Sequence, residues 1–283
     1  MVTDNKETIK RFKLYTTGSF LGDEAVINNS KKSIVERYYI FSYYLEINDF
    51  KILINTGFSE HVKPSTDLKT LKLFQRQDYK VYESLPSQLM KNHVHPDEID
   101  YCIITNFASH HIGYLNAFKN ATIITSSEAY HDFITQQVTN NNLQLSFHVM
   151  PDDFKERIEF VDDFVKADHP ILGTGNKVFN QDVIISYQLP GAMPGQIGLM
   201  LKFPELNIFM CSDAAWCRSN IEKDVLPTKR LLKQAYNGEL FIDTHAKLID
   251  LKSHNEDPLF IIPSHCKKMD DFEEVMQLLD AIN

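Results

Sequence analysis

Short runs of apolar and β-branched residues recur along the chain, separated by turn signals, and this pattern is typical of buried strands. Asn48-Asp49 predicts a hairpin turn between two of these runs, and Gly18 and Gly22 predict turns after the first run. The runs predict strands at Phe12–Thr16, Glu36–Ile47, Lys51–Asn55, Tyr101–Thr105, Ala121–Ile124, Val183–Gln188, Ile197–Phe203, Leu206–Cys211 and Leu259–Ile262.

Helical periodicity appears between these runs. Thr125 and Glu128 have the spacing of a capping box and predict a helix that runs to about Thr139. Residues 140–176 are largely polar and predict irregular structure. Apolar spacing predicts further helical structure within residues 59–92 and in two later segments, Pro227–Tyr236 and Met269–Ile282. With no internal repeat or linker, we expect one α/β domain over residues 1–283.

Composition narrows the class of protein. Hydrophobic residues make up 43% and charged residues 24% of the 283 residues, as in ordinary globular chains. A net charge of −9 argues against a nucleic-acid surface. No apolar run is long enough to span a bilayer, and the first thirty residues lack a signal-peptide core. The four cysteines lack disulfide or zinc-ribbon spacing, so we expect a cytoplasmic location.

The strongest chemical signal lies in residues 101–113, where a strand-like run ends in a turn that carries His110 and His111. This stretch resembles the metal-binding loop of the metallo-β-lactamase superfamily, in which a strand is followed by T/S-H-x-H-x-D-H-x-G. Asn106 and Ala108 stand at the first two histidine positions of that loop. His110 stands at the aspartate position, and only His111 matches the family pattern.

Two segments before and after this loop strengthen the resemblance. Ile52–Gly57 resembles the early strand that ends in D-T-G, with Asn55 in place of the aspartate. Leu189–Gly198 resembles P-G-H-T-P-G-H-x-x-G, with Ala192 at the position of the third metal-binding histidine.

Two later segments complete the order of motifs. Phe209–Trp216 resembles the strand that ends in G-D-A, with Asp213 at the metal-bridging position, and Ile261–His265 resembles the last strand with its terminal histidine. Among subfamilies, the lead-in and the P-G-x-x-P-G turn look most like N-acyl-homoserine lactonases.

The resemblance implies an αββα sandwich with one metal site lost and one kept. The first site needs three histidines and has none of them. Three imidazoles and one carboxylate form a reasonable Zn²⁺ site. Two histidines with a carboxylate are also ligand types of non-haem iron proteins, so Fe and Mn stay open, as does a protein without metal. The implied ligands are His110, His111, Asp213 and His265.

Each candidate also has a purely structural interpretation. The two adjacent histidines and Asp213 are compatible with capping or hydrogen bonding in a former pocket. The pair His93 and His95 reads H-x-H, but it precedes the strand, and its continuation lacks the last histidine. Cys217 and Cys266 fit buried small residues. Trp216 follows Asp213 closely, which suits either substrate binding or core packing.

The resemblance therefore implies a single-metal hydrolase-like enzyme for a small ester, lactone or related substrate, with Asp213 as the catalytic metal ligand. Four protein ligands would fill a zinc site, although catalytic zinc keeps an open position. The alternatives are a non-catalytic relative that binds a small molecule or partner in the old pocket, and a mononuclear iron oxygenase. We expect a small-molecule ligand, neither nucleic acid nor a membrane as a partner, and leave a homodimer open.

Overall fold

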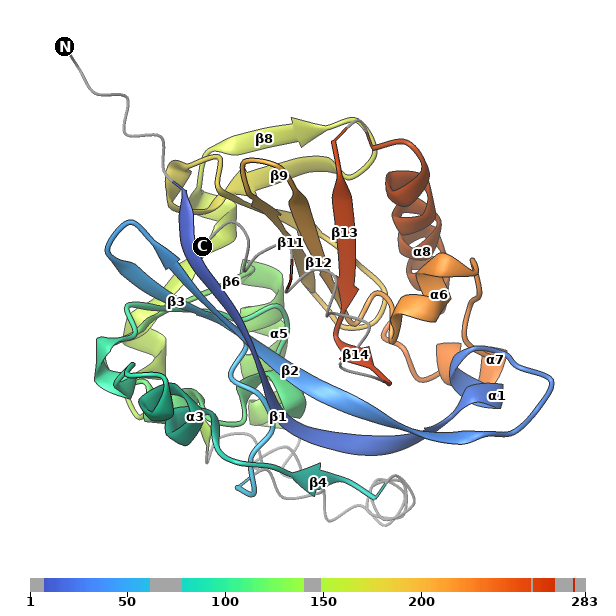
Figure 1. Cartoon of the computed structure of the whole chain (residues 1–283), viewed down its shortest axis with the longest axis horizontal. Helices are drawn as coiled ribbons and strands as arrows, with labels where there is room; N and C mark the ends of the chain where they lie inside the picture. The colour runs from blue at the N-terminus through green and yellow to red at the C-terminus, as the bar shows by residue number, and fades with distance from the viewer. Residues whose placement is uncertain (1–7, 62–77, 140–148, 256, 268–276, 278–283) are drawn as a thin grey trace.

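Two β-sheets lie face to face at the centre of the protein, and helices cover their outer faces (Figure 1). The structure is a computed structural model that describes residues 8–61, 78–139, 149–255, 257–267 and 277. One cluster of buried apolar side chains lies between the sheets, and two more lie beneath the helices on either side. This arrangement confirms the predicted αββα sandwich.

The first sheet is mixed, because an antiparallel half joins a parallel half at β3. The short β14 (His265–Cys266) pairs with β2 and brings the last described part of the chain to this sheet. The order of the other strands is β4 (Lys80–Val81), β1 (Ile9–Asp23), β2 (Val35–Ile47), β3 (Phe50–Ile54), β5 (Tyr101–Ile103), β6 (Thr122–Thr125) and β7 (Ile158–Phe160).

The second sheet is antiparallel except at one edge, where the first strand of the order below runs parallel to its neighbour. Its order is β13 (Leu259–Pro263), β12 (Asn207–Ser212), β11 (Ile197–Lys202), β10 (Ile184–Gln188), β9 (Gly173–Lys177) and β8 (Lys166–His169). The described α-helices are α1 (Glu24–Ile27), α3 (Leu85–Lys91), α4 (Ser109–Ile112), α5 (Ser127–Thr139), α6 (Arg218–Glu222), α7 (Lys229–Leu232) and α8 (Gly238–Ser253).

Apolar side chains on both faces of β2 are buried, which explains why this strand lies in the middle of the fold. Successive side chains of a strand point to opposite faces. Phe41 and Leu45 pack between the sheets, whereas Ile40 and Tyr44 pack in the cluster beneath the helices. Burying such a side chain contributes roughly 1.5–3 kcal/mol, so both faces of β2 stabilise the sandwich.

The first strand is longer than the sequence predicts, and the prediction of turns at Gly18 and Gly22 is wrong. Both glycines lie inside β1. A Cβ atom at Gly18 would lie 2.7 Å from the backbone oxygen of Lys80, and one at Gly22 would lie 2.8 Å from the ring of Tyr38. The glycines therefore mark close approaches to neighbouring groups and not turns.

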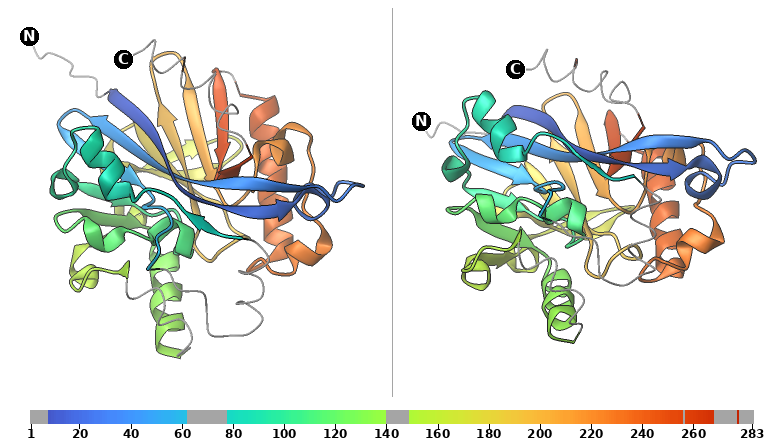
Figure 2. Two further views of the ribbon diagram at one scale, coloured as in Figure 1. Left: turned by 60° about the horizontal axis from the view of Figure 1, so that its bottom comes forward. Right: turned by 90° about the horizontal axis from the view of Figure 1, so that it is seen from below.

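The long strands β1 and β2 form a hairpin that reaches across the molecule toward α6, α7 and α8 (Figure 2). The backbone of Thr228 donates a hydrogen bond to Val26 at the end of this hairpin, with 3.0 Å between N and O. The contact joins segments far apart in sequence and brings the hairpin beside the segment that contains α7.

The prediction of irregular structure over residues 140–176 is wrong for part of its described portion, which contains β7, β8 and most of β9. These short strands contain polar side chains and glycines, so they lack the run of apolar residues that predicts a strand. The helix α8 was not predicted, and α7 is shorter than the predicted Pro227–Tyr236. The predicted helix Met269–Ile282 lies outside the described residues except for position 277.

The helix predicted after Ala121–Ile124 is present as α5, but its start differs. Ser126 Oγ accepts a hydrogen bond from the backbone of Ala129, while Thr125 Oγ1 donates to the carbonyl of Ile104. Thr125 is therefore part of the strand network and does not cap the helix. Among the described residues, no helix is long and apolar enough to cross a membrane.

Candidate metal centre

The candidate site lies where strands of both sheets end. In the first sheet β3 and β5 run parallel, and in the second β12 and β13 run parallel, so the chain leaves each pair at the same edge. The segments that follow β5, β12 and β13 carry the histidines and the aspartate of the site. The loops after strand ends are therefore what bring these residues together.

Asn106 forms the turn that carries the two adjacent histidines. Its Oδ1 accepts a hydrogen bond of 2.8 Å from the backbone of Ala108, the residue that precedes α4. The single turn of α4 then presents His110 and His111 with their ring centroids 4.1 Å apart. His111 is buried, and the side chain of His110 is 20% exposed.

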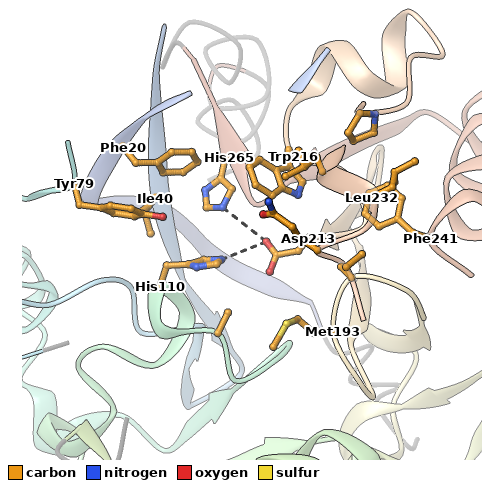
Figure 3. Close-up of a pocket in the computed structure, with 16 residues that line it drawn as sticks. Phe20, Ile40, Tyr79, His110, Met193, Asp213, Trp216, Leu232, Phe241 and His265 are labelled. Carbon is orange, nitrogen blue, oxygen red and sulfur yellow. Dashed lines mark hydrogen bonds and ion pairs between the residues drawn. The ribbon is translucent and has the colours of Figure 1, made fainter. Parts of the chain in front are cut away.

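The carboxylate of Asp213 faces His110 and His265 across the site (Figure 3). Its carboxylate Oδ1 is 3.3 Å from His110 Nε2, and Oδ2 is 3.1 Å from His111 Nε2. Burial alone would raise the pKa of Asp213, but the adjacent His111 and His110 hold that pKa well below its ordinary value. The side chain is therefore a buried carboxylate anion.

His265 approaches the same carboxylate from β14. Its Nδ1 donates a hydrogen bond of 3.1 Å to the carbonyl oxygen of Tyr39, which leaves the lone pair of a neutral ring on Nε2. Nε2 lies 3.8 Å from Asp213 Oδ1. Burial, aided by nearby His110, lowers the pKa of His265 to about 3, so the ring is neutral at neutral pH.

These residues form a donor set that fits a divalent metal ion. Donor atoms of His110, Asp213 and His265 all lie within 4.8 Å of one another, in the one such group found among the described residues. A lone pair of His265 faces a carboxylate oxygen at 3.8 Å, and two acceptors at that spacing are stabilised by a cation between them. Two imidazoles and a carboxylate are common ligands of Zn²⁺ and Fe²⁺.

His111 lies outside this group of three. The resemblance implies that it is a metal ligand, whereas the structure places its Nε2 beside the other oxygen of Asp213. Burial, aided by nearby His110, lowers the pKa of His111. Donor atoms of three implied ligands thus lie within 4.8 Å of one another, and the fourth, His111, contacts the second oxygen of Asp213.

Asn106 lies beside Asp213 and contacts three buried acceptors. Its Nδ2 lies 2.9 Å from Asp213 Oδ2, 3.0 Å from Gln196 Oε1 and 3.2 Å from Ser212 Oγ. All four residues are buried. Sequence analysis missed the roles of Gln196 and Ser212, although Gln196 belongs to the second Pro-Gly turn and Ser212 directly precedes Asp213.

An open cavity of about 210 Å³ adjoins the candidate metal ligands. Trp216 lines it, and its ring also packs edge-on against Phe20 and His265. Ala108 and Ala192, which replace two family histidines, lie in the wall. No lysine or arginine is among the described lining residues, and most of the others are apolar: Phe20, Ile40, Tyr79, Met193, Pro227, Leu231, Leu232, Ala235 and Phe241.

Tyr79 is a cavity residue that sequence analysis missed, because it lies in a segment without a motif. Its ring stacks on Phe20 with 5.4 Å between centroids. Burial and nearby Asp213 raise the pKa of the Tyr79 phenol, so it stays protonated.

The upstream H-x-H pair lies in a different environment. His95 accepts a hydrogen bond from Asp97 at the start of the short 3₁₀ helix Pro96–Glu98, and its side chain is 60% exposed. Cys217 is buried and hydrogen-bonded to Asn28 and Ser219. Neither His95 nor Cys217 belongs to the group of converging donors among the described residues.

Comparisons with known proteins give a consistent answer for the fold. No family model matches the sequence, and no curated protein matches it. An N-acyl homoserine lactone hydrolase structure is 17% identical with a TM-score of 0.66, covering 94% of this chain and 96% of that chain. A hydrolase of the β-lactamase superfamily is 12% identical with a TM-score of 0.61, covering 92% of this chain and 90% of that one.

The protein has the metallo-β-lactamase fold. A dizinc quorum-quenching lactonase is a further similar structure, at 12% identity and a TM-score of 0.59, with 93% of this chain and 92% of that chain covered. Among the described residues, this protein has one group of converging metal-type donors, His110, Asp213 and His265.

Proposed function

We propose that the protein is a hydrolase that uses one divalent metal ion, held by His110, Asp213 and His265, to cleave a small neutral ester or lactone. The convergence of these three donors at the wall of an open cavity carries the proposal. It is also supported by the similarity to metal-dependent hydrolases.

Three ligands suit catalysis better than four. Two histidines and one carboxylate are a ligand set of catalytic zinc sites, which keep a further position for water or substrate. His110 is the most exposed of the three side chains and lines the cavity with Asp213 and His265. A bound ion would supply a Lewis acid for a carbonyl group or for water at this wall.

The residues of the cavity select an uncharged substrate. An anionic group of a substrate would have no lysine or arginine to pair with among the described lining residues, and Asp213 would repel it with its negative charge. Apolar side chains from the β1–β2 hairpin and from the α7 region bind an apolar substituent by burying its surface. The indole N–H of Trp216 is a donor that can orient a carbonyl oxygen.

A second function is favoured by the same ligand types. The two-histidine, one-carboxylate set also binds Fe²⁺ in non-haem oxygenases, which need open coordination positions. A non-catalytic binding protein is the remaining alternative, since an apolar cavity suits a small ligand without any chemistry.

One experiment separates the three functions. The chain is stripped with a chelator, reloaded with Zn²⁺ or with Fe²⁺, and assayed against neutral esters and lactones with apolar substituents of different length. The proposal predicts zinc-dependent hydrolysis of neutral substrates and none of matched phosphate esters. Oxygen consumption with Fe²⁺ but no hydrolysis would identify an oxygenase. Substrate binding without turnover under either metal would identify a binding protein.

A further inference from the structure

A positively charged surface lies at the end of the β1–β2 hairpin, although the whole chain has a net charge of −9. The loop of the hairpin carries Lys31 and Lys32, and α7 with the residue after it carries Lys229, Arg230 and Lys233. All five residues are exposed. The two elements are neighbours, because α1 at the end of the hairpin contacts α7 and the two lie side by side in both views (Figure 1, Figure 2). We call these five residues the basic patch.

Few negative charges oppose the basic patch. No aspartate or glutamate occurs in residues 25–35 or 225–238. The acidic residues next to these two stretches are Glu24, Glu36, Asp224 and Glu239. Glu24 is paired with Lys267 and Asp224 contacts His245, which leaves two exposed acids against five cations. None of the five forms an ion pair with another described residue, so their charge is available to a partner.

Apolar side chains are exposed beside these cations. Ile34 and Val35, where β2 begins, are 47% and 60% exposed, and Tyr236 after α7 is 60% exposed. The carbonyl oxygen of Ile34 accepts a hydrogen bond of 2.9 Å from the backbone of Glu24, so the loop that carries these side chains is held to α1. Apolar groups interspersed with lysine and arginine are the composition of surfaces that bind at a lipid–water interface.

The two elements that carry the basic patch also form walls of the open cavity. Leu231 and Leu232 of α7 line the cavity, whereas the cations of the same segment are exposed. Phe20 and Ile40 of the hairpin line it as well. A partner bound at the basic patch therefore contacts the same elements that would enclose a substrate.

We propose that the basic patch, together with Ile34, Val35 and Tyr236, is a docking surface for a membrane that contains anionic lipids. Each lysine or arginine near such a surface raises the affinity roughly fivefold, and the exposed apolar side chains enter the interface. Negative charges elsewhere on the chain oppose docking little, because salt screens charges beyond about 8 Å. The expectation that no membrane is a partner was based on the lack of a spanning segment, and docking at the surface needs none.

A membrane fits this surface better than an acidic protein or a nucleic acid. Either of those partners would pair with the cations, but neither needs exposed aliphatic side chains among them. Neutral esters and lactones with apolar substituents also partition into bilayers, so docking brings the cavity to where such substrates are concentrated. This role for the substrate rests on the proposed function, whereas the docking itself does not.

Sedimentation of the full chain with vesicles tests the docking. One set of vesicles is phosphatidylcholine alone, and the other contains phosphatidylcholine and phosphatidylserine in equal parts. We expect binding to the anionic vesicles only, and release from them as the salt concentration is raised. Equal binding to both sets, or binding to neither, would overturn the proposal.

Paired variants locate the docking surface. Removing two cations of the basic patch, by Lys31→Gln with Lys32→Gln, should weaken binding to the anionic vesicles by about 25-fold. The control is Lys119→Gln with Lys155→Gln, which removes the same charge from exposed residues outside the patch and should leave binding unchanged. Equal weakening in both variants would assign the binding to net charge and overturn the patch.

An apolar variant distinguishes a membrane from another anionic partner. Val35→Ser with Tyr236→Ser keeps every charge and should weaken vesicle binding, because the interface loses two apolar side chains. Undiminished binding would show that charge alone acts. Polyglutamate and an oligonucleotide duplex serve as competitors, and tighter binding of either than of the anionic vesicles would overturn the choice of a membrane.

The docking and the proposed function fail in different ways. A chain that hydrolyses neutral esters in solution but does not bind anionic vesicles would overturn the docking alone. A chain that binds anionic vesicles through the basic patch but hydrolyses no ester or lactone with any metal would overturn the proposed function alone.

Discussion

The two oxygens of Asp213 have different neighbours. Oδ2 receives hydrogen bonds from Asn106 and His111, while Oδ1 faces His110 at 3.3 Å and His265 at 3.8 Å. An oxygen already bound by two donors is a poor ligand for a second metal ion. Asn106 therefore stabilises Oδ2 of the buried carboxylate.

The candidate ligands can be tested by alanine substitution. His110→Ala and His265→Ala should each release the metal, because losing one ligand of three removes much of the binding free energy. His93→Ala and His95→Ala are the controls, and their metal content should equal that of the parent protein. Elemental analysis after dialysis measures the outcome. Loss of metal in the control variants with retention in the first two would move the site to the upstream H-x-H pair.

The hydrogen bonds of Asn106 should stabilise the fold even without metal. Asn106→Ala leaves buried acceptors on Asp213, Gln196 and Ser212 short of a donor, which should lower the free energy of unfolding by about 1–3 kcal/mol. Urea unfolding in the presence of a chelator measures this change. Asn120→Ala removes an exposed hydrogen bond to Asp97 and is the matched control, with an expected change within about 0.5 kcal/mol. Equal effects of the two substitutions would argue against the network.

The sequence predicted the candidate site unevenly, for a physical reason. His110, Asp213 and His265 each follow a strong strand signal, so the order of motifs placed them at neighbouring strand ends. Which oxygen of Asp213 each histidine faces depends on side-chain geometry, and no sequence motif encodes that geometry. Tyr79 enters the cavity through ring stacking with Phe20, and this contact leaves no periodic pattern in the sequence.

At the scale of elements, buried strands were predictable and exposed ones were not. The segments at β2, β3, β10, β11 and β12 have continuous apolar runs because both their faces are covered. The edge strand β8 and its neighbour β9 contain polar residues and glycines, and they lack such runs. Helix α8 has buried Phe241, Leu248 and Leu251 at helical spacing, so its pattern was present in the sequence and was missed.

The start of α8 affects both stability and the cavity wall. Asn237 caps the helix by accepting hydrogen bonds from the backbones of Glu239 and Leu240 at 3.0 and 3.1 Å. Phe241, in the first turn of the helix, lines the cavity. Asn237→Ala should therefore lower the free energy of unfolding by about 0.5–2 kcal/mol. Asn237→Asp keeps a side-chain acceptor, so its free energy of unfolding should stay close to that of the parent protein. Thermal or urea unfolding of both variants checks the prediction, and an equal loss in both would contradict the capping role.

At the scale of the whole molecule, the metallo-β-lactamase fold supplies the strand ends, and the residues there determine the chemistry. Solved structures with this fold include a dizinc lactonase and an N-acyl homoserine lactone hydrolase. One ion stabilises less developing charge than two. Hydrolysis of β-lactams and of acyl-homoserine lactones should thus be slow, far below about 10 per second, a usual enzyme rate. Steady-state assays of the zinc-loaded chain that reach that rate would contradict the one-metal account.

The number of metal ions per chain tests the central claim most directly. The purified protein is loaded with excess Zn²⁺, dialysed against a weak chelator and measured for zinc and protein concentration. The account predicts one zinc per chain, bound at His110, Asp213 and His265. Two zinc ions per chain would show that a second site survives without its three histidines, and no zinc would show that the three converging donors do not form a metal site.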